Sequence, residues 1–394
     1  MHCKNHIARR HFIGLLAAGL PFVREARPQN SSARKEGSML LLVGTYTSGE
    51  SKSKGIYVLK FDPRDGGITP HGVVDGVEEP SFLAIDEPRN FVYAVNETLE
   101  FNGQKSGSVS SFALRPDAGA LKFINKQPSM GAAPCHITVS HDGKFVLVAN
   151  YLGGNVAVLP VSKDGVLMPA VDIKQHSGSG PDKKRQDSAH AHSVILDQNG
   201  RFAFVNDLGV DKIFIYEFDA ATGRLNPNRN QPYFQTKPGA GPRHLKFHPS
   251  GKYAFVINEL DMTISSLAYD AAKGSLKEVQ TVSTLPSGFS GDNTCADIHV
   301  TPDGAFLYAS NRGHDSLVGF KVDPQSGRLE LIGHTSTQGK TPRNFLIDPT
   351  GKYLLVANQR SDSIVTFEIE KKTGRLRSIG GKVTVPSPVC LQLV

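Results

Sequence analysis

The chain has 394 residues and a formal net charge of +7, but this charge is distributed too unevenly to indicate a nucleic-acid-binding surface. Residues 1–38 contain seven basic and two acidic residues, a net of +5, so residues 39–394 carry only +2. A domain whose net charge is so close to zero lacks the broad cationic surface that binding to a phosphate backbone requires. We therefore expect no nucleic-acid partner. The four cysteines are scattered without a CxxC pair, which indicates neither a zinc site nor a disulfide framework.

The amino terminus has the pattern of an export signal. Arg9 and Arg10 precede a short apolar segment that Pro21 interrupts and that ends near Val23. This pattern resembles a twin-arginine signal, and the apolar segment is too short to span a bilayer. We expect residues 1–38 to be an export-type leader with a disordered segment, and residues 39–394 to be a folded domain that is periplasmic or secreted. The alternative is an accidental arginine pair in a cytoplasmic protein, because no clear Ala-x-Ala cleavage site follows.

Six segments of the chain can be aligned on a shared turn. They begin at residues 80, 134, 191, 242, 295 and 342. Each has an apolar run, a turn such as His-Asp-Gly-Lys at 141–144, and a second apolar run that ends in Asn, which is a hairpin signal. A third, alternating run follows, as at 213–218, and then a Gly-x-Leu turn, such as Gly-Arg-Leu at 223–225, and an outer strand. Four antiparallel strands repeated about every fifty residues predict an all-β protein of the β-propeller type.

The two ends of the chain together predict one further blade. Residues 40–61 supply a middle strand and a third strand but no innermost strand. Residues 388–393 have the sequence form that opens each of the other repeats. We therefore expect a seven-bladed β-propeller that closes by pairing its C-terminal strand with its N-terminal blade.

Two repeat positions should line one mouth of the central channel. In an antiparallel hairpin the start of the first strand lies beside the end of the second, so both positions face the axis at one rim. The residues that follow the opening position are Ser81, Cys135, His192, Arg243, Ala296, Arg343 and Val389. The residues that follow the repeated Asn, with their counterpart in the first blade, are Tyr46, Glu97, Tyr151, Asp207, Glu259, Arg312 and Gln359. Repeats agree where packing decides the residue type, so this mixture indicates a functional site.

Four of these residues come from successive blades and should converge on one sector of the mouth. They are His192 and Arg243 on the first ring and Glu259 and Arg312 on the second. A carboxylate and an imidazole can activate water, and two guanidinium groups can hold an anionic substrate or the charge that develops during attack on a carbonyl. The chain has no Gly-x-Ser-x-Gly nucleophile elbow here, so we expect no covalent intermediate.

The motifs that carry these residues are Ala-His-Ala-His-Ser (189–193), Gly-Pro-Arg-His (241–244), Ile-Asn-Glu (257–259) and Ser-Asn-Arg-Gly (310–313). Together they resemble the seven-bladed lactonase family, which includes a bacterial 6-phosphogluconolactonase and a fungal enzyme that interconverts carboxymuconate and its lactone. The resemblance extends over about residues 40–393. It implies a hydrolase that opens a sugar lactone, such as 6-phosphogluconolactone, with His192, Glu259 and Arg243 as catalytic residues and Arg312 as a substrate-binding residue.

Two further ring residues, Arg343 and Asp207, are added to the substrate-binding set. Salt bridges or caps between blades are the alternative for both of them and for Glu97. The leader departs from the family pattern, because phosphorylated gluconolactone is a cytoplasmic metabolite, so the sequence leaves open which lactone is used and whether it is phosphorylated.

Several histidines have simpler explanations than catalysis. His190 and His192 share a strand face and could begin a metal site, but without an obvious third ligand we expect no metal and no cofactor. His136 and His244 lie one residue beyond the ring, and we expect them to point into the packing between blades.

The remaining alternatives concern the loop before the third repeat and the molecule as a whole. The charged run 182–187 is typical of a solvated loop, or it could help to hold an anionic substrate. A non-catalytic scaffold or a carboxymuconate-type lactonising enzyme is the alternative function, although a scaffold should have a more apolar mouth. We expect a monomer that binds a small, anionic lactone and has no membrane span.

Overall fold

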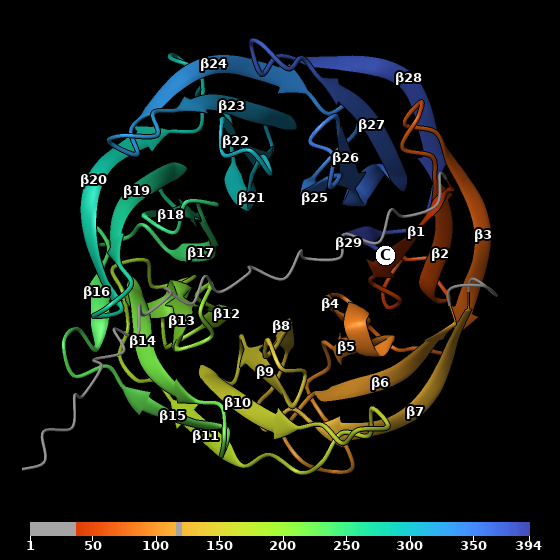
Figure 1. Ribbon diagram of the computed structural model, residues 1–394, viewed down its shortest axis with the longest axis vertical. Helices are drawn as coiled ribbons and strands as arrows, with labels where there is room; N and C mark the ends of the chain where they lie inside the picture. The colour runs from red at the N-terminus through yellow and green to blue at the C-terminus, as the bar shows by residue number, and fades with distance from the viewer. Residues whose placement is uncertain (1–36, 116–119) are drawn as a thin grey trace, which may run out of the picture. The chain divides into compact units, whose positions relative to one another are not determined.

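The apolar runs of the sequence form seven antiparallel sheets around a central axis, as Figure 1 shows. The structure is a computed structural model that describes residues 37–115 and 120–394, so almost all of the expected leader lies outside the described residues. Six sheets have four strands, and one has a fifth, short strand. In the part of the chain that is described, no helix is long and apolar enough to cross a membrane. The predicted seven-bladed β-propeller is confirmed.

Each blade runs from an innermost strand at the axis to an outer strand at the rim. The first three blades are β29 (Pro388–Leu393), β1 (Met39–Thr45), β2 (Gly55–Phe61), β3 (Ile68–Asp75); β4 (Leu83–Asp86), β5 (Phe91–Asn96), β6 (Ser108–Arg115), β7 (Ala120–Pro128); and β8 (Pro134–Val139), β9 (Phe145–Asn150), β10 (Asn155–Pro160), β11 (Asp172–Gln175). The fourth and fifth are β12 (Ala191–Leu196), β13 (Phe202–Asp207), β14 (Lys212–Asp219), β15 (Arg224–Pro227), with β16 (Tyr233–Gln235) also paired to β14; and β17 (Pro242–Phe247), β18 (Tyr253–Asn258), β19 (Thr263–Asp270), β20 (Ser275–Ser283). The last two are β21 (Thr294–Val300), β22 (Phe306–Arg312), β23 (Ser316–Val322), β24 (Leu329–Ser336); and β25 (Pro342–Ile347), β26 (Tyr353–Asn358), β27 (Ser363–Ile369), β28 (Leu376–Thr384). Short 3₁₀ turns are η1 (Glu87–Arg89), η3 (Leu208–Val210) and η4 (Gln359–Ser361).

The core lies between the blades. The second strands β9, β13, β18 and β26 are buried at every residue, as their continuous apolar sequences predict. The outer strand β24 is fully buried only at Leu329, since its other face meets solvent. Seven apolar clusters, each shared by two neighbouring blades, fill the interfaces around the ring. Burial between blades therefore fixes where every inner strand meets the axis.

The ring is closed by the two ends of the domain. Strand β29 pairs antiparallel with β1, with Leu42 opposite Gln392. Leu40 and Val394 exchange backbone hydrogen bonds of 3.2 and 2.9 Å. Without β29, strand β1 would be an unpaired edge.

The innermost strands share an irregularity at one position. The strand register skips a residue between Pro134 and His136, Ala191 and Ser193, Pro242 and His244, and Pro342 and Asn344, and similar shifts occur in the β1–β29 and β21–β22 pairs. Such a bulge leaves the extra residue out of the ladder and redirects its side chain. The skipped residues include Cys135, His192, Arg243 and Arg343, which belong to the first predicted ring.

Candidate active site

Glu259, the residue directly after β18, is the centre of a buried cluster of charges. Its side chain is 3% exposed and contacts three guanidinium groups. Arg185 Nη2 lies 2.6 Å from Oε1, whereas Arg243 Nε and Arg312 Nη2 lie 3.0 and 2.9 Å from Oε2. Burial alone would raise the pKa of Glu259, but the three arginines outweigh it and lower the pKa from 4.5 to about 2. The carboxylate is therefore ionised at neutral pH.

Arg243 is held in place by contacts on two of its three nitrogens. Nη1 donates to the carbonyl oxygen of Ala296 and lies 3.2 Å from His244 Nε2, while Nε faces Glu259. None of these contacts uses Nη2. Burial, followed by repulsion from Arg312 and Arg343, lowers the pKa of Arg243 to about 10, so the group remains a cation at neutral pH.

Arg312 ends β22 and faces the same carboxylate. Its Nη2 donates to the carbonyl oxygen of Cys295 at 2.6 Å as well as contacting Glu259. Its buried Nε has no hydrogen-bond partner among the described residues. This nitrogen is therefore an unused donor within the cluster.

His192 lies beside the carboxylate as a neutral ring. Its Nε2 is 4.0 Å from Glu259 Oε2, and its Nδ1 is 3.7 Å from Cys135 Sγ. Burial, with repulsion from Arg243, lowers the pKa of His192 well below 6.5. The structure thus brings together His192, Arg243, Glu259 and Arg312, as their ring positions predict.

Arg343 belongs to a second polar group at the mouth. Its Nη2 donates to the Tyr46 hydroxyl at 2.8 Å, and that hydroxyl donates to Glu97 Oε2 at 3.0 Å. Ser81 also donates to Glu97 at 2.5 Å. Burial raises the pKa of Glu97 despite the attraction of Arg343. Arg343 is therefore tied to the first two blades, yet it also lines the cleft beside Arg312.

Asp207 is not brought to this cluster, which corrects its assignment as a substrate-binding residue. Its side chain is fully buried, and Oδ2 lies 2.7 Å from His176 Nδ1. Oδ1 accepts hydrogen bonds from the backbone N–H of His190 at 2.7 Å and of Gly209 at 3.1 Å. The chain turns into η3 directly after Asp207, and the carboxylate caps that turn instead of facing the axis. Its contacts are those of a structural residue.

His190 is likewise held by the protein. Its Nδ1 lies 3.0 Å from the Tyr151 carbonyl oxygen, its Nε2 lies 3.1 Å from Asp187, and its ring stacks on Tyr151 at 4.5 Å. Within residues 37–115 and 120–394, no group of three His, Cys, Asp or Glu side chains has the arrangement of a metal site.

Arg185 shows that the charged run 182–187 is more than a solvated loop. Besides Glu259, its Nη2 contacts the Tyr151 hydroxyl at 3.3 Å, while 38% of the side chain remains exposed. The neighbouring Gln186 is fully buried, and its amide donates to Leu208 O and Asp211 Oδ1 at 2.8 and 2.7 Å. An anchored loop thus carries a cation into the mouth. The repeat alignment cannot find such a residue, because the loop has no counterpart in other blades.

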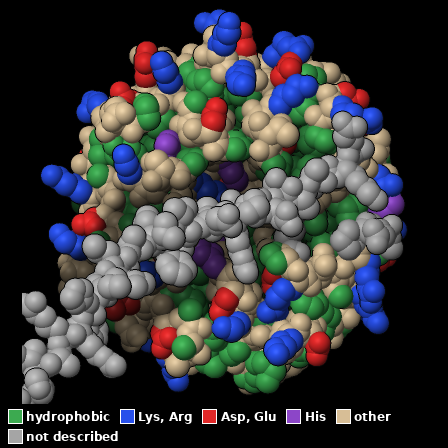
Figure 2. Space-filling model, viewed as in Figure 1, with side chains coloured by type: hydrophobic (Ala, Val, Ile, Leu, Met, Phe, Trp, Pro, Cys, Tyr) green, Lys and Arg blue, Asp and Glu red, His purple; other side chains and the backbone are tan. Residues whose placement is uncertain are grey.

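A cleft of about 650 Å³ opens beside Arg312. Its charged lining residues are Arg312, Arg343, Lys340, Arg360, Asp292 and Asp315. Basic groups outnumber acidic ones there, so the cleft suits an anionic ligand. Figure 2 shows one face of the ring hollowed at its centre, with basic and histidine side chains inside the hollow.

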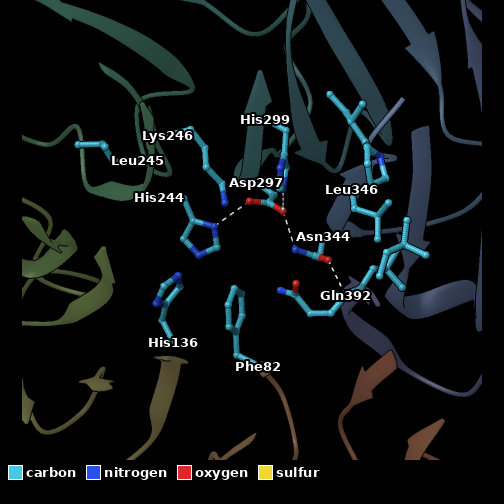
Figure 3. Close-up of a pocket in the computed structure, with 14 residues that line it drawn as sticks. Phe82, His136, His244, Leu245, Lys246, Asp297, His299, Asn344, Leu346 and Gln392 are labelled. Carbon is cyan, nitrogen blue, oxygen red and sulfur yellow. Dashed lines mark hydrogen bonds and ion pairs between the residues drawn. The ribbon is translucent and has the colours of Figure 1, made fainter. Parts of the chain in front are cut away.

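His136 and His244 do not point into the packing between blades, which corrects that prediction. Both line a second cavity of about 260 Å³, which we call the histidine cavity, between the innermost strands (Figure 3). The centroids of their rings lie 5.5 Å apart, and the His136 ring packs at a tilt against Phe82 at 4.3 Å. The prediction assumed that successive side chains of the strand point in opposite directions. The bulge before each histidine breaks this alternation, so the histidine that follows the ring position also faces the channel.

These features define a seven-bladed propeller with a buried, strongly charged polar site at one mouth of its channel. The sequence model of the family described as Lactonase, 7-bladed beta-propeller matches residues 40–393, and the chain belongs to this family. A 6-phosphogluconolactonase of Bacillus subtilis strain 168 is 36% identical over 352 residues, which are 89% of this chain and 97% of the relative. A 6-phosphogluconolactonase of Formosa agariphila is 36% identical over 78% of this chain and 86% of its own length. The solved structure of a Pseudomonas aeruginosa periplasmic gluconolactonase is 36% identical, with a TM-score of 0.84 over 91% of this chain and 99% of that one.

Proposed function

We propose that the protein is a lactonase that hydrolyses a sugar lactone to its open acid at the cluster around Glu259. Family membership supports this activity, as do the relatives named 6-phosphogluconolactonase and gluconolactonase. The observation that carries the choice of site is the buried, ionised Glu259 between Arg243 and Arg312, beside a neutral His192. Burying such charges costs more than an apolar contact of the same volume, so stability alone does not account for them.

In this proposal His192 takes a proton from the attacking water. Both His192 and Glu259 are unprotonated at neutral pH, but both oxygens of Glu259 already contact guanidinium groups, which makes its carboxylate the weaker proton acceptor for this step. Glu259, 4.0 Å away, then stabilises the imidazolium that forms. The water oxygen bonds to the lactone carbonyl carbon, the ring C–O bond breaks, and the imidazolium returns its proton to the departing alkoxide oxygen.

The arginines would stabilise the oxyanion of the tetrahedral intermediate. Arg312 Nε is buried without a hydrogen-bond partner among the described residues, and Arg243 Nη2 is not used by the contacts that hold Nη1 and Nε of the same side chain. Donors that are already fixed by other contacts need little reorganisation during the reaction. Removing one such donor costs about 10² to 10³ in turnover in other hydrolases.

The rest of the substrate would occupy the cleft beside Arg312. Lys340, Arg343 and Arg360 supply positive charge there, which favours a substrate with a phosphate or carboxylate group. Arg185 is the most exposed of the three arginines on Glu259, so it can leave the carboxylate to contact such a group.

We further propose that the protein is exported and acts as a monomer. The Arg9-Arg10 pair before a weakly apolar segment supports export, and a structural relative is named a periplasmic gluconolactonase. An exported enzyme would meet unphosphorylated lactones, whereas the basic cleft suits phosphorylated ones.

A panel of lactones tests the proposal and decides between these substrates. Phosphorylated and unphosphorylated gluconolactone, together with carboxymuconolactone, are incubated with the protein, and acid release is corrected for spontaneous hydrolysis. We expect at least one of the two gluconolactones to be opened at a k_cat/K_M within the ordinary enzyme range of about 10⁴ M⁻¹s⁻¹ or more. No acceleration with any sugar lactone would overturn the proposed function.

A further inference from the structure

The histidine cavity contains a chain of hydrogen bonds that ends on an arginine of the proposed active site. Asp297 Oδ1 lies 2.8 Å from His244 Nδ1, and His244 Nε2 lies 3.2 Å from Arg243 Nη1. Figure 3 shows the Asp297 carboxylate between His244, His299 and Asn344. His244 is 5% exposed and Asp297 is 1% exposed, so these contacts are shielded from bulk solvent.

The direction of each hydrogen bond follows from the chemistry of the groups. An arginine can only donate, so His244 Nε2 must carry the lone pair and Nδ1 the proton. Nδ1–H then donates to Asp297, which is an acceptor when ionised. Both neighbours of His244 therefore require the same neutral tautomer.

The Asp297 carboxylate, at one end of this series of hydrogen bonds, is held by several further contacts. Oδ1 also accepts from the backbone N–H of Ile298 at 3.0 Å. Oδ2 accepts from Asn344 at 2.5 Å and from His299 Nε2 at 3.0 Å, and the Phe345 N–H lies 3.4 Å away. Burial would raise the pKa of Asp297, but its contacts with His299 and His244 hold it well below 3.8. The carboxylate is thus a rigid, ionised anchor.

We propose that Asp297 and His244 are positioning residues that hold Arg243 for catalysis, an inference that rests on the proposed lactonase function. A long arginine side chain facing a carboxylate can adopt several ion-pair geometries. Here His244 and the Ala296 carbonyl hold Nη1, and the ion pair with Glu259 holds the Nε side, so these contacts leave Nη2 for the substrate. The position of Nη2 therefore depends on a histidine that contacts no reacting atom.

The first test compares two substitutions of His244 with a matched control. His244→Leu removes the acceptor from Arg243, and we expect k_cat to fall about 10- to 100-fold, because displacements of about 1 Å can cost that much. K_M should change less than about threefold, since the interaction acts on the transition state. His244→Gln places a carbonyl oxygen near the former Nε2, and it should recover most of the lost k_cat.

His248→Leu is the control. His248 is also 5% exposed, follows the same strand β17, and has both ring nitrogens hydrogen-bonded, to Ser250 at 2.8 Å and Gly304 O at 3.0 Å. It should lower stability to a similar extent while leaving k_cat near the wild-type value. Equal losses of k_cat in the two leucine variants would show that His244 is merely structural, which would overturn the proposal.

A double-mutant cycle tests whether His244 acts through Arg243. If it does, His244→Leu should have no further effect on k_cat in an Arg243→Met background. Effects that multiply independently would overturn the proposal.

An NMR measurement keeps the proposal testable if the leucine variant does not fold or if no lactone is hydrolysed. In ¹⁵N-histidine-labelled wild-type protein, the ring missing from the His244→Gln spectrum identifies His244. We expect the neutral Nδ1–H tautomer for this ring. The Nε2–H tautomer or a protonated ring at neutral pH would overturn the positioning role, whereas inactivity towards lactones together with the expected tautomer would overturn only the proposed function.

Discussion

Replacing Glu259 by glutamine should destabilise the folded propeller as well as slow the reaction. Within the described site, the Glu259 carboxylate is the only anion that contacts three guanidinium groups. The glutamine carbonyl can still accept from Arg243 and Arg312 at the Oε2 position, while its amide group faces Arg185, which can move into solvent. Two buried cations would then lie together without a counter-ion. Breaking a buried ion pair from one side typically costs about 3–5 kcal/mol.

The lowered pKa of Glu259 gives an independent estimate of the same cost. A carboxyl whose pKa falls from 4.5 to about 2 on folding contributes roughly 3 kcal/mol above pH 5. Because the folded-state pKa is the lower one, this contribution is present above pH 4.5 and is lost as the pH falls towards 2. The stability difference between wild type and Glu259→Gln should therefore be largest near neutrality and should shrink between pH 4.5 and 2.

Chemical denaturation of both proteins at several pH values measures this difference. With an unfolding entropy of about 2.1 cal/mol/K per residue, a loss of 3–5 kcal/mol corresponds to a melting temperature roughly 4–7 °C lower for residues 38–394. A Glu259→Gln protein as stable as the wild type at pH 7, or a difference that is independent of pH, would refute the reasoning.

Three further predictions concern closure, export and substrate binding. Deleting residues 387–394 removes β29 and exposes the edge of β1, so the truncated protein should aggregate or lose cooperative unfolding in a melting experiment, and an unchanged melting curve would contradict the closure. Replacing Arg9 and Arg10 by lysine should retain the protein in the cytoplasm of a host with a twin-arginine pathway, as cell fractionation would show, and unaltered export would mean that the leader is misinterpreted. Arg185→Ala should raise the K_M for an anionic lactone about tenfold with little loss of stability, because its side chain is 38% exposed, and an unchanged K_M would remove Arg185 from the substrate site.

The repeats allowed most of the fold to be predicted from the sequence. Each blade repeats one hairpin pattern, so the alignment gave the number of blades, the closure through residues 388–393 and the rim at which each hairpin exposes its ends. The placement of Glu259 and Arg312 followed from this rule alone. Their proximity to His192 and Arg243 then required only that successive repeats be neighbours in space.

The errors arose where local geometry departs from the ideal hairpin. The bulge after Pro242 directs both Arg243 and His244 towards the channel. The alternation of polar and apolar residues in the sequence does not indicate this bulge. Asp207 starts a 3₁₀ turn that most other blades lack, so its carboxylate binds backbone N–H groups. Arg185 lies in a loop without a counterpart in other repeats. Such features depend on single blades, which an alignment of blades cannot describe.

The turnover number of the site variants tests the central claim most directly. With the best lactone from the panel, k_cat is measured for wild type, His192→Ala and Glu259→Gln, at a temperature where each protein is fully folded, and corrected for spontaneous hydrolysis. Loss of the proton acceptor or of the group that stabilises it should lower k_cat by about 10² to 10⁴. If both variants open the lactone at the wild-type rate, the chemistry does not take place at the cluster around Glu259.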